Sequence, residues 1–129
     1  MTDYLAAMPF AAKVGVEIES AKPDEVRGAL EWAPDLCTAG GLLHGGALMS
    51  VADSVGGLCA YLNLPQGATG TATIESKTNF FRGVREGRLT ARAKPLHVGR
   101  SFIVVQTNLA DASGKPVAQV TQTQAVLAS

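Results

Sequence analysis

The chain has few of the residues that build metal sites, disulfide frameworks and secretion signals. Its 129 residues include two cysteines, Cys37 and Cys59, and two histidines, His44 and His97. The cysteines form no CxxC pair and the histidines stand far apart, so no zinc site can be assembled at normal ligand spacing. The first residues contain no basic segment followed by a long apolar run. We therefore expect a reduced, cytoplasmic protein that holds no metal.

Charge is also scarce, since charged residues make up 17% of the chain and the formal net charge is zero. A nucleic-acid-binding protein normally carries a clear basic excess, so we expect no nucleic-acid partner. The charges are unevenly placed: eight acids and three bases stand up to Asp53, and three acids and eight bases stand from Glu75 onward. This basic half could dock an anionic small molecule, or it could form a solvated strand face that pairs with the acidic half.

Three common nucleotide-binding and hydrolase motifs are missing as well. The chain has no GxGxxG and no GxxxxGK[ST], which argues against a dinucleotide-binding fold and a P-loop. It has no GxSxG, so it lacks the motif that presents the nucleophilic serine of an α/β-type serine hydrolase. The length and the 47% content of hydrophobic residues fit one domain over residues 1–129 with its own core.

Hydrophobic periodicity and turn residues predict one long helix and six strands. The long helix covers 46–64 and is apolar on nearly every side, so it is either buried or membrane-spanning. About 18 residues is a short membrane span, and Asp53 in its middle favours burial and no membrane partner. The remaining predicted elements are a short helix over 4–12, acting as a lid or a packing element, and strands over 14–20, 26–32, 71–81, 89–98, 101–110 and 116–127.

This order of elements predicts an α+β architecture, with one curved antiparallel sheet wrapped around a long central helix. A single sheet cannot cover every side of an apolar helix. We therefore expect a second copy of the chain to cover the rest, which predicts a homodimer.

The residues with the clearest chemical potential stand where the long helix begins. Gly45 and Gly46 leave their amides open to a ligand at a helix N-terminus, a plausible oxyanion hole. Asp53 follows two turns later, with no Lys or Arg within four residues. An ionised carboxylate there is costly unless it is paired or hydrogen-bonded, so Asp53 is either functional or structurally satisfied, by hydroxyls or by a distant base such as Arg82. Taken alone, His44 is more often a satisfied loop histidine than a functional residue.

These residues resemble a known family. The stretch 43–53, with His44-Gly45-Gly46 and a carboxylate nine positions after the histidine, resembles the hotdog-fold acyl-CoA thioesterases, especially the phenylacetate-degradation subgroup. The order of elements agrees from about residue 10 onward. Segments 85–88 and 94–99 look like those of bacterial aroyl-CoA and dihydroxynaphthoyl-CoA members. The resemblance implies a hotdog fold and a homodimer joined edge to edge, often doubled to a homotetramer.

The same resemblance implies an active site shared by two subunits. The loop with His44, Gly45 and Gly46 comes from one subunit, and Asp53 comes from the other. The Gly45 amide would polarise the thioester carbonyl, His44 would orient the loop, and Gly46 would contact the substrate. Asp53 would act as nucleophile or as general base for water. No cofactor is implied, because coenzyme A is part of the substrate.

The chain departs from the family pattern at two positions. Members commonly carry Asn or Gln six residues before the histidine, where this chain has Thr38. Some members use a hydroxyl side chain on the helix four residues after the carboxylate, where this chain has Gly57. Other members take the hydroxyl from the following strand, which assigns the water-positioning role to Thr73, with Thr71 as the second choice.

The resemblance also gives the basic half a purpose, because coenzyme A carries a pyrophosphate and a 3′-phosphate. In relatives the nucleotide lies beside the turns of the strand meander. Arg82, after the first strand that follows the helix, and Gly99 with Arg100, in the next turn, are the positions that match.

The expected function is hydrolysis of an acyl-CoA or aroyl-CoA thioester, and two alternatives stay open. A hotdog hydratase or dehydratase shares the fold but uses a different, proline-containing loop signature. A non-catalytic acyl-CoA sensor is favoured if Thr38 means that the site has lost its chemistry. The acyl group is open too, because Phe80, Phe81, Met49 and Leu58 could line a pocket or belong to the core.

Overall fold

The computed structural model describes residues 2–128. The described chain contains two α-helices, three short 3-10 helices and six strands. In chain order the elements are η1 (Tyr4–Ala7), α1 (Pro9–Val14), β1 (Glu17–Lys22), β2 (Glu25–Glu31), η2 (Pro34–Leu36), η3 (Ala39–Gly41), α2 (Gly45–Leu62), β3 (Ala68–Phe80), β4 (Arg88–Val98), β5 (Phe102–Ala110) and β6 (Pro116–Ala128).

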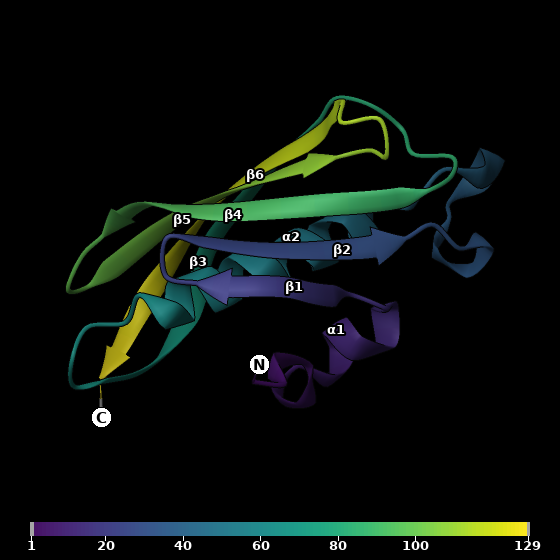
Figure 1. Cartoon of the computed structure of the whole chain (residues 1–129). Helices are drawn as coiled ribbons and strands as arrows, with labels where there is room; N and C mark the ends of the chain where they lie inside the picture. Colours follow the sequence, from purple (N-terminus) through teal and green to yellow (C-terminus); the bar gives the residue numbers. More distant parts are fainter. Residues whose placement is uncertain (1, 129) are drawn as a thin grey trace.

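The six strands form one antiparallel sheet that curves around α2 (Figure 1). The strand order is β1-β2-β4-β5-β6-β3, so β3 crosses the sheet to pair with β6 and becomes an edge strand. The predicted α+β architecture, with a curved sheet around a long helix, is confirmed. Strand β3 begins at Ala68, three residues earlier than predicted, because its pairing with β6 continues to Ala128.

Helix α2 starts and ends on side-chain caps. At its start the Nδ1 atom of His44 accepts a hydrogen bond from the Gly46 amide at 2.8 Å. At its end the Nδ2 group of Asn63 donates to the Cys59 carbonyl at 2.8 Å and to the Pro23 carbonyl at 2.7 Å. These bonds satisfy groups that a helix terminus leaves free, and they fix α2 to the β1–β2 turn.

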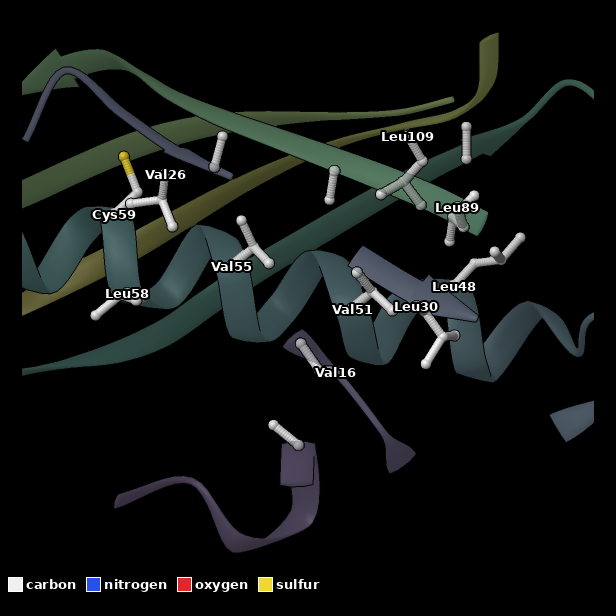
Figure 2. Packing of buried hydrophobic residues seen from close by; sticks show 14 of the residues in the cluster. Val16, Val26, Leu30, Leu48, Val51, Val55, Leu58, Cys59, Leu89 and Leu109 are labelled. Carbon is white, nitrogen blue, oxygen red and sulfur yellow. The ribbon is translucent and has the colours of Figure 1, made fainter. Parts of the chain in front are cut away.

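Helix α2 lies between the sheet and the N-terminal segment (Figure 2). Val51 and Val55 are fully buried, and they pack in one cluster with Leu30, Leu89 and Leu109 from three strands. Burying each such side chain contributes about 1.5–3 kcal/mol to the free energy that stabilises the folded chain. The helix is long and apolar enough to cross a membrane by length and composition alone. Here its buried face is the centre of the core.

Residues 4–14 form two short helices rather than one. The predicted helix over 4–12 is divided into η1 and α1, since Pro9 begins α1 after Met8, whose φ of −127° and ψ of 70° are not helical. Gly15 ends α1, with a φ of 100° that glycine adopts without strain. This segment packs against α2 on the side away from the sheet (Figure 2).

Much of the basic half is paired with acids on the outer face of the sheet. Arg88 makes ion pairs with Glu17, Glu19 and Glu31, and its nearest contacts are 2.9–3.0 Å. Arg92 and Lys94 both contact Glu25. Charge pairing between the two halves is therefore confirmed for these three bases. Because the pairs are exposed, each contributes little to stability.

Strand β3 leaves one long edge open. It spans 13 residues, and among residues 2–128 no strand pairs with its outer edge. Ile74 on this strand is 57% exposed, and Phe80 and Phe81 at its end are 51% and 59% exposed. Long apolar edges invite pairing with another chain.

Candidate active site

Asp53 lies on the exposed face of α2, beside a cavity of about 830 Å³. The cavity is lined by α2, by the edge strand β3, by β6 and by the N-terminal segment 2–11. Its polar lining near the carboxylate comes from Ser54 on α2, Thr71 and Thr73 on β3, and Gln124 on β6. The structure therefore brings Asp53 together with both hydroxyl residues that the sequence singled out.

The Asp53 carboxylate has no structural partner that would explain its position. Burial raises its pKa through desolvation, which is the one resolved cause of the shift, even though the side chain keeps access to solvent in the single chain. The neighbouring hydroxyls are engaged elsewhere: Ser50 donates to the Gly46 carbonyl and Ser54 to the Ser50 carbonyl. Within residues 2–128 the carboxylate is thus free to act on a bound molecule.

Thr73 is held by a buried amide. The Nε2 group of Gln124 donates to the Thr73 hydroxyl oxygen at 2.8 Å. Gln124 is 2% exposed, whereas Thr73 is exposed. The hydroxyl is therefore fixed from the protein side and open on the cavity side.

The loop with the histidine and two glycines offers one open amide, not two. The Gly46 amide donates to His44 Nδ1, and the Ala47 amide donates to the His44 carbonyl at 2.9 Å. The Gly45 amide, first in α2, has no acceptor among the described residues. The expectation that both glycine amides stand open is corrected, because the helix cap uses the one at Gly46.

Gly45 lies in a second cavity of about 350 Å³. Thr38, Phe80 and Arg82 line the same cavity. A Cβ atom at position 45 would lie 3.3 Å from the Phe80 ring, so glycine lets that ring approach the helix start. The second cavity therefore combines an open amide, a threonine hydroxyl and a guanidinium group.

The two cavities share no lining residue. Gly45 and Asp53 are eight positions apart on one helix, which corresponds to about 12 Å along its axis. A carbonyl bound at the Gly45 amide is therefore out of reach of the same chain's Asp53. We call the Gly45 cavity the carbonyl half-site and the Asp53 cavity the acid half-site, after the roles that the family resemblance implies for these two residues.

The structure separates the residues matched to the coenzyme A phosphates. Arg82 lies beside the carbonyl half-site and also lines a cleft of about 470 Å³ with Arg85 and Asp111. Gly99 and Arg100 form the β4–β5 turn at the opposite end of the sheet (Figure 1). Strand β4 between them is 11 residues long, or about 35 Å. Within one chain these residues do not form a single phosphate site.

Comparison with known proteins places the chain in a family. Residues 40–118 match the family described as the Thioesterase superfamily, and the chain belongs to it. The chain is 37% identical over 87 residues to the 1,4-dihydroxy-2-naphthoyl-CoA hydrolase of Escherichia coli, a match that covers 67% of this chain and 63% of that enzyme. This chain therefore spans less than two thirds of that relative's length. The phenylacetate-degradation subgroup is not singled out by these matches.

Solved structures confirm the hotdog fold. A thioesterase from Haemophilus influenzae is similar with a TM-score of 0.86 and 27% identity, covering 92% of this chain and 82% of that one. A mutant thioesterase from Pseudomonas aeruginosa has a TM-score of 0.90 and 28% identity, covering 97% and 91%. A hypothetical thioesterase from Streptococcus pneumoniae, solved with coenzyme A, shares the fold with a TM-score of 0.84 and 23% identity, covering 96% and 97%.

Sequence reasoning missed two contributors to the acid half-site. One is the N-terminal segment, whose Tyr4, Met8 and Phe10 line the same cavity as Asp53. The other is Gln124, which only the fold brings next to Thr73. The signal for Gln124 was a polar residue at an inward position of β6, in alternation with Val120 and Gln122.

Proposed function

We propose that this protein hydrolyses coenzyme A thioesters of acyl or aroyl groups, as a cytoplasmic homodimer with two shared active sites. The observation that supports this most directly is the unpartnered Asp53 carboxylate, which lies with Thr73 at a cavity in a Thioesterase superfamily chain. The similarity to a hydrolase of an aromatic CoA thioester supports the substrate class.

In this proposal the thioester carbonyl binds at the carbonyl half-site. The open Gly45 amide and the N-terminal end of the α2 dipole stabilise negative charge that develops on the oxygen. His44 keeps the loop in place, because its Nδ1 atom caps the helix. Thr38 supplies a hydroxyl where many relatives carry an amide.

The acid half-site supplies the attacking group. Asp53 either removes a proton from a water molecule or attacks the carbonyl itself, and its raised pKa makes it a better proton acceptor than an ordinary aspartate. The Thr73 hydroxyl holds the water on the cavity side. Departure of the coenzyme A thiolate then leaves the free acid, directly or after hydrolysis of an Asp53 anhydride.

Pairing of two copies through β3 would bring the half-sites together. The open edge of β3 and the exposed apolar side chains on it supply the surface for such pairing. The acid half-site of one copy would then face the carbonyl half-site of the other. Arg82, beside the carbonyl half-site, would bind coenzyme A phosphate, and further pairing of dimers would give the homotetramer.

The activity is tested by release of thiol from phenylacetyl-, hydroxybenzoyl-, hexanoyl- and palmitoyl-CoA. We expect hydrolysis by the wild type and a loss of several orders of magnitude in kcat for Asp53→Asn. The preferred member of the panel identifies the acyl class. If the wild type binds these esters without hydrolysing them, the proposal is wrong, and the acyl-CoA sensor that Thr38 would suit replaces it.

The shared site is tested by mixing two inactive variants. Asp53→Asn removes the acid half-site, and Gly45→Pro removes the open amide. In a mixed dimer one site receives an intact Gly45 from one chain and an intact Asp53 from the other. Random reassortment at equal concentrations therefore restores about a quarter of the wild-type activity. A mixture as inactive as its components would show that each site is built within one chain.

A further inference from the structure

Strand β6 carries two buried glutamines among apolar inward residues. Gln122 is 0% exposed and Gln124 is 2% exposed. A buried amide is costly unless it is hydrogen-bonded, so each needs an explanation. Gln124 has one, because it donates to Thr73 across the β3–β6 pair. Gln122 has no hydrogen-bond partner among residues 2–128 and does not line the Asp53 cavity.

The direction of this hydrogen bond decides what Thr73 can do. A glutamine Nε2 group only donates, so the Thr73 oxygen is the acceptor at 2.8 Å. The hydroxyl has a single proton, and that proton cannot point at the nitrogen that donates to it. It is left to point away from Gln124. Thr73 and Gln124 both line the cavity beside Asp53, so the cavity is where this proton can find an acceptor.

Without Gln124 the Thr73 hydroxyl would turn freely. Thr73 is exposed and stands on the open edge strand, where no other side chain of residues 2–128 is hydrogen-bonded to its hydroxyl. A threonine in that position has several staggered orientations. The buried amide removes this freedom before a substrate binds, and preorganised donors are the ones that stabilise a transition state efficiently.

We propose that Gln124 is a positioning residue that fixes the Thr73 hydroxyl as a hydrogen-bond donor toward the reacting water beside Asp53. The role rests on the proposed thioester hydrolysis. Gln124 touches no reacting atom and acts through Thr73. Removal of the Gln124 side-chain amide lowers kcat and leaves substrate binding nearly unchanged.

The test compares Gln124→Met with Thr73→Val, the double variant and Gln122→Met. Methionine keeps the length of glutamine and removes the amide, and Gln122→Met is the matched control because it removes a buried amide from the same strand. We expect Gln124→Met to lower kcat roughly tenfold, the size of one lost hydrogen bond, with KM unchanged. The double variant should be no slower than Thr73→Val, and Gln122→Met should keep the wild-type kcat.

Three outcomes would overturn the role of Gln124 in an active enzyme. The first is a wild-type kcat for Gln124→Met, and the second is a double variant whose loss is the product of the two single losses. The third is an equal loss for Gln122→Met, which would indicate general damage to the core. A wild type inactive on every thioester would instead refute the proposed function, and this role with it. The side-chain amide resonances of Gln124 separately report the hydrogen bond, since Thr73→Val should shift them and leave those of Gln122 in place.

Discussion

Gly45→Pro offers a way to delete a single backbone amide from the carbonyl half-site. Gly45 is the first residue of α2, a position where proline is favoured because the amide has no partner within the helix. The preceding residue, His44, has φ −61° and ψ 137°, the extended conformation that a following proline requires. The variant should therefore keep the helix and lose only the N–H group.

The expected loss follows from the hydrogen bonds around the loop. The Gly46 and Ala47 amides already have acceptors, so neither can replace the one at Gly45. Removing one oxyanion donor costs about 100- to 1,000-fold in kcat. We expect Gly45→Pro to fall in this range, and KM to change much less, because the amide acts on charge that develops in the transition state.

Gly45→Ala is the matched control. It adds a Cβ atom, which would lie 3.3 Å from the Phe80 ring, and it keeps the amide. The ring is half exposed and can shift by a few tenths of an ångström. Thiol release and circular dichroism are measured for both variants. The reasoning is refuted if Gly45→Pro folds and retains most of its kcat, or if alanine is as damaging as proline.

Three further predictions follow from the charges and the packing. Arg82→Ala should raise KM for CoA thioesters and leave kcat unchanged, and an equal fall in kcat and kcat/KM would contradict a phosphate-binding role. Burial raises the pKa of Asp53, so the ionised carboxylate destabilises the fold as pH rises through that pKa. Asp53→Asn should therefore raise Tm at pH 7. The difference in Tm between the variant and the wild type should disappear below pH ~4, where the carboxyl group is protonated in both the folded and the unfolded chain. Gly56→Ala would place a Cβ atom against Gln122 Oε1 and should lower the free energy of unfolding by about 1–3 kcal/mol. Gly57→Ala, whose Cβ atom meets nothing within 4 Å, should not destabilise the protein in the same denaturation assay.

The sequence predicted the fold because its local signals are strong and agree with one another. The apolar run from Gly45 to Leu62 is bounded by glycines, Asn63 and Pro65, and strands β4, β5 and β6 alternate between inward and outward residues over most of their length. The element ends moved by a few residues where tertiary pairing extended them, as at Ala68.

The site was predictable only where one residue type carries the chemistry. Asp53 stands out as an unpaired carboxylate in an apolar helix, and this needs no knowledge of the fold. The contact between Gln124 and Thr73 joins positions 51 residues apart, and a cross-strand register decides it. The particular partners of Gly46 and Arg88 were not predictable either, because the His44 side chain binds the Gly46 amide and three acids from β1 and β2 surround Arg88 only in the folded chain.

The open edge of β3 also has a consequence for how the protein reaches its working form. Before the proposed dimer forms, a folded single chain presents the unpaired outer edge of a 13-residue strand together with exposed apolar side chains. Chain folding is then followed by a second-order association step, whose rate rises with protein concentration. At low concentration the unassociated chain persists, so dilution favours the inactive form, and the open edge stays available to strands of other proteins. Synthesis of many copies close together in space and time would shorten that vulnerable interval.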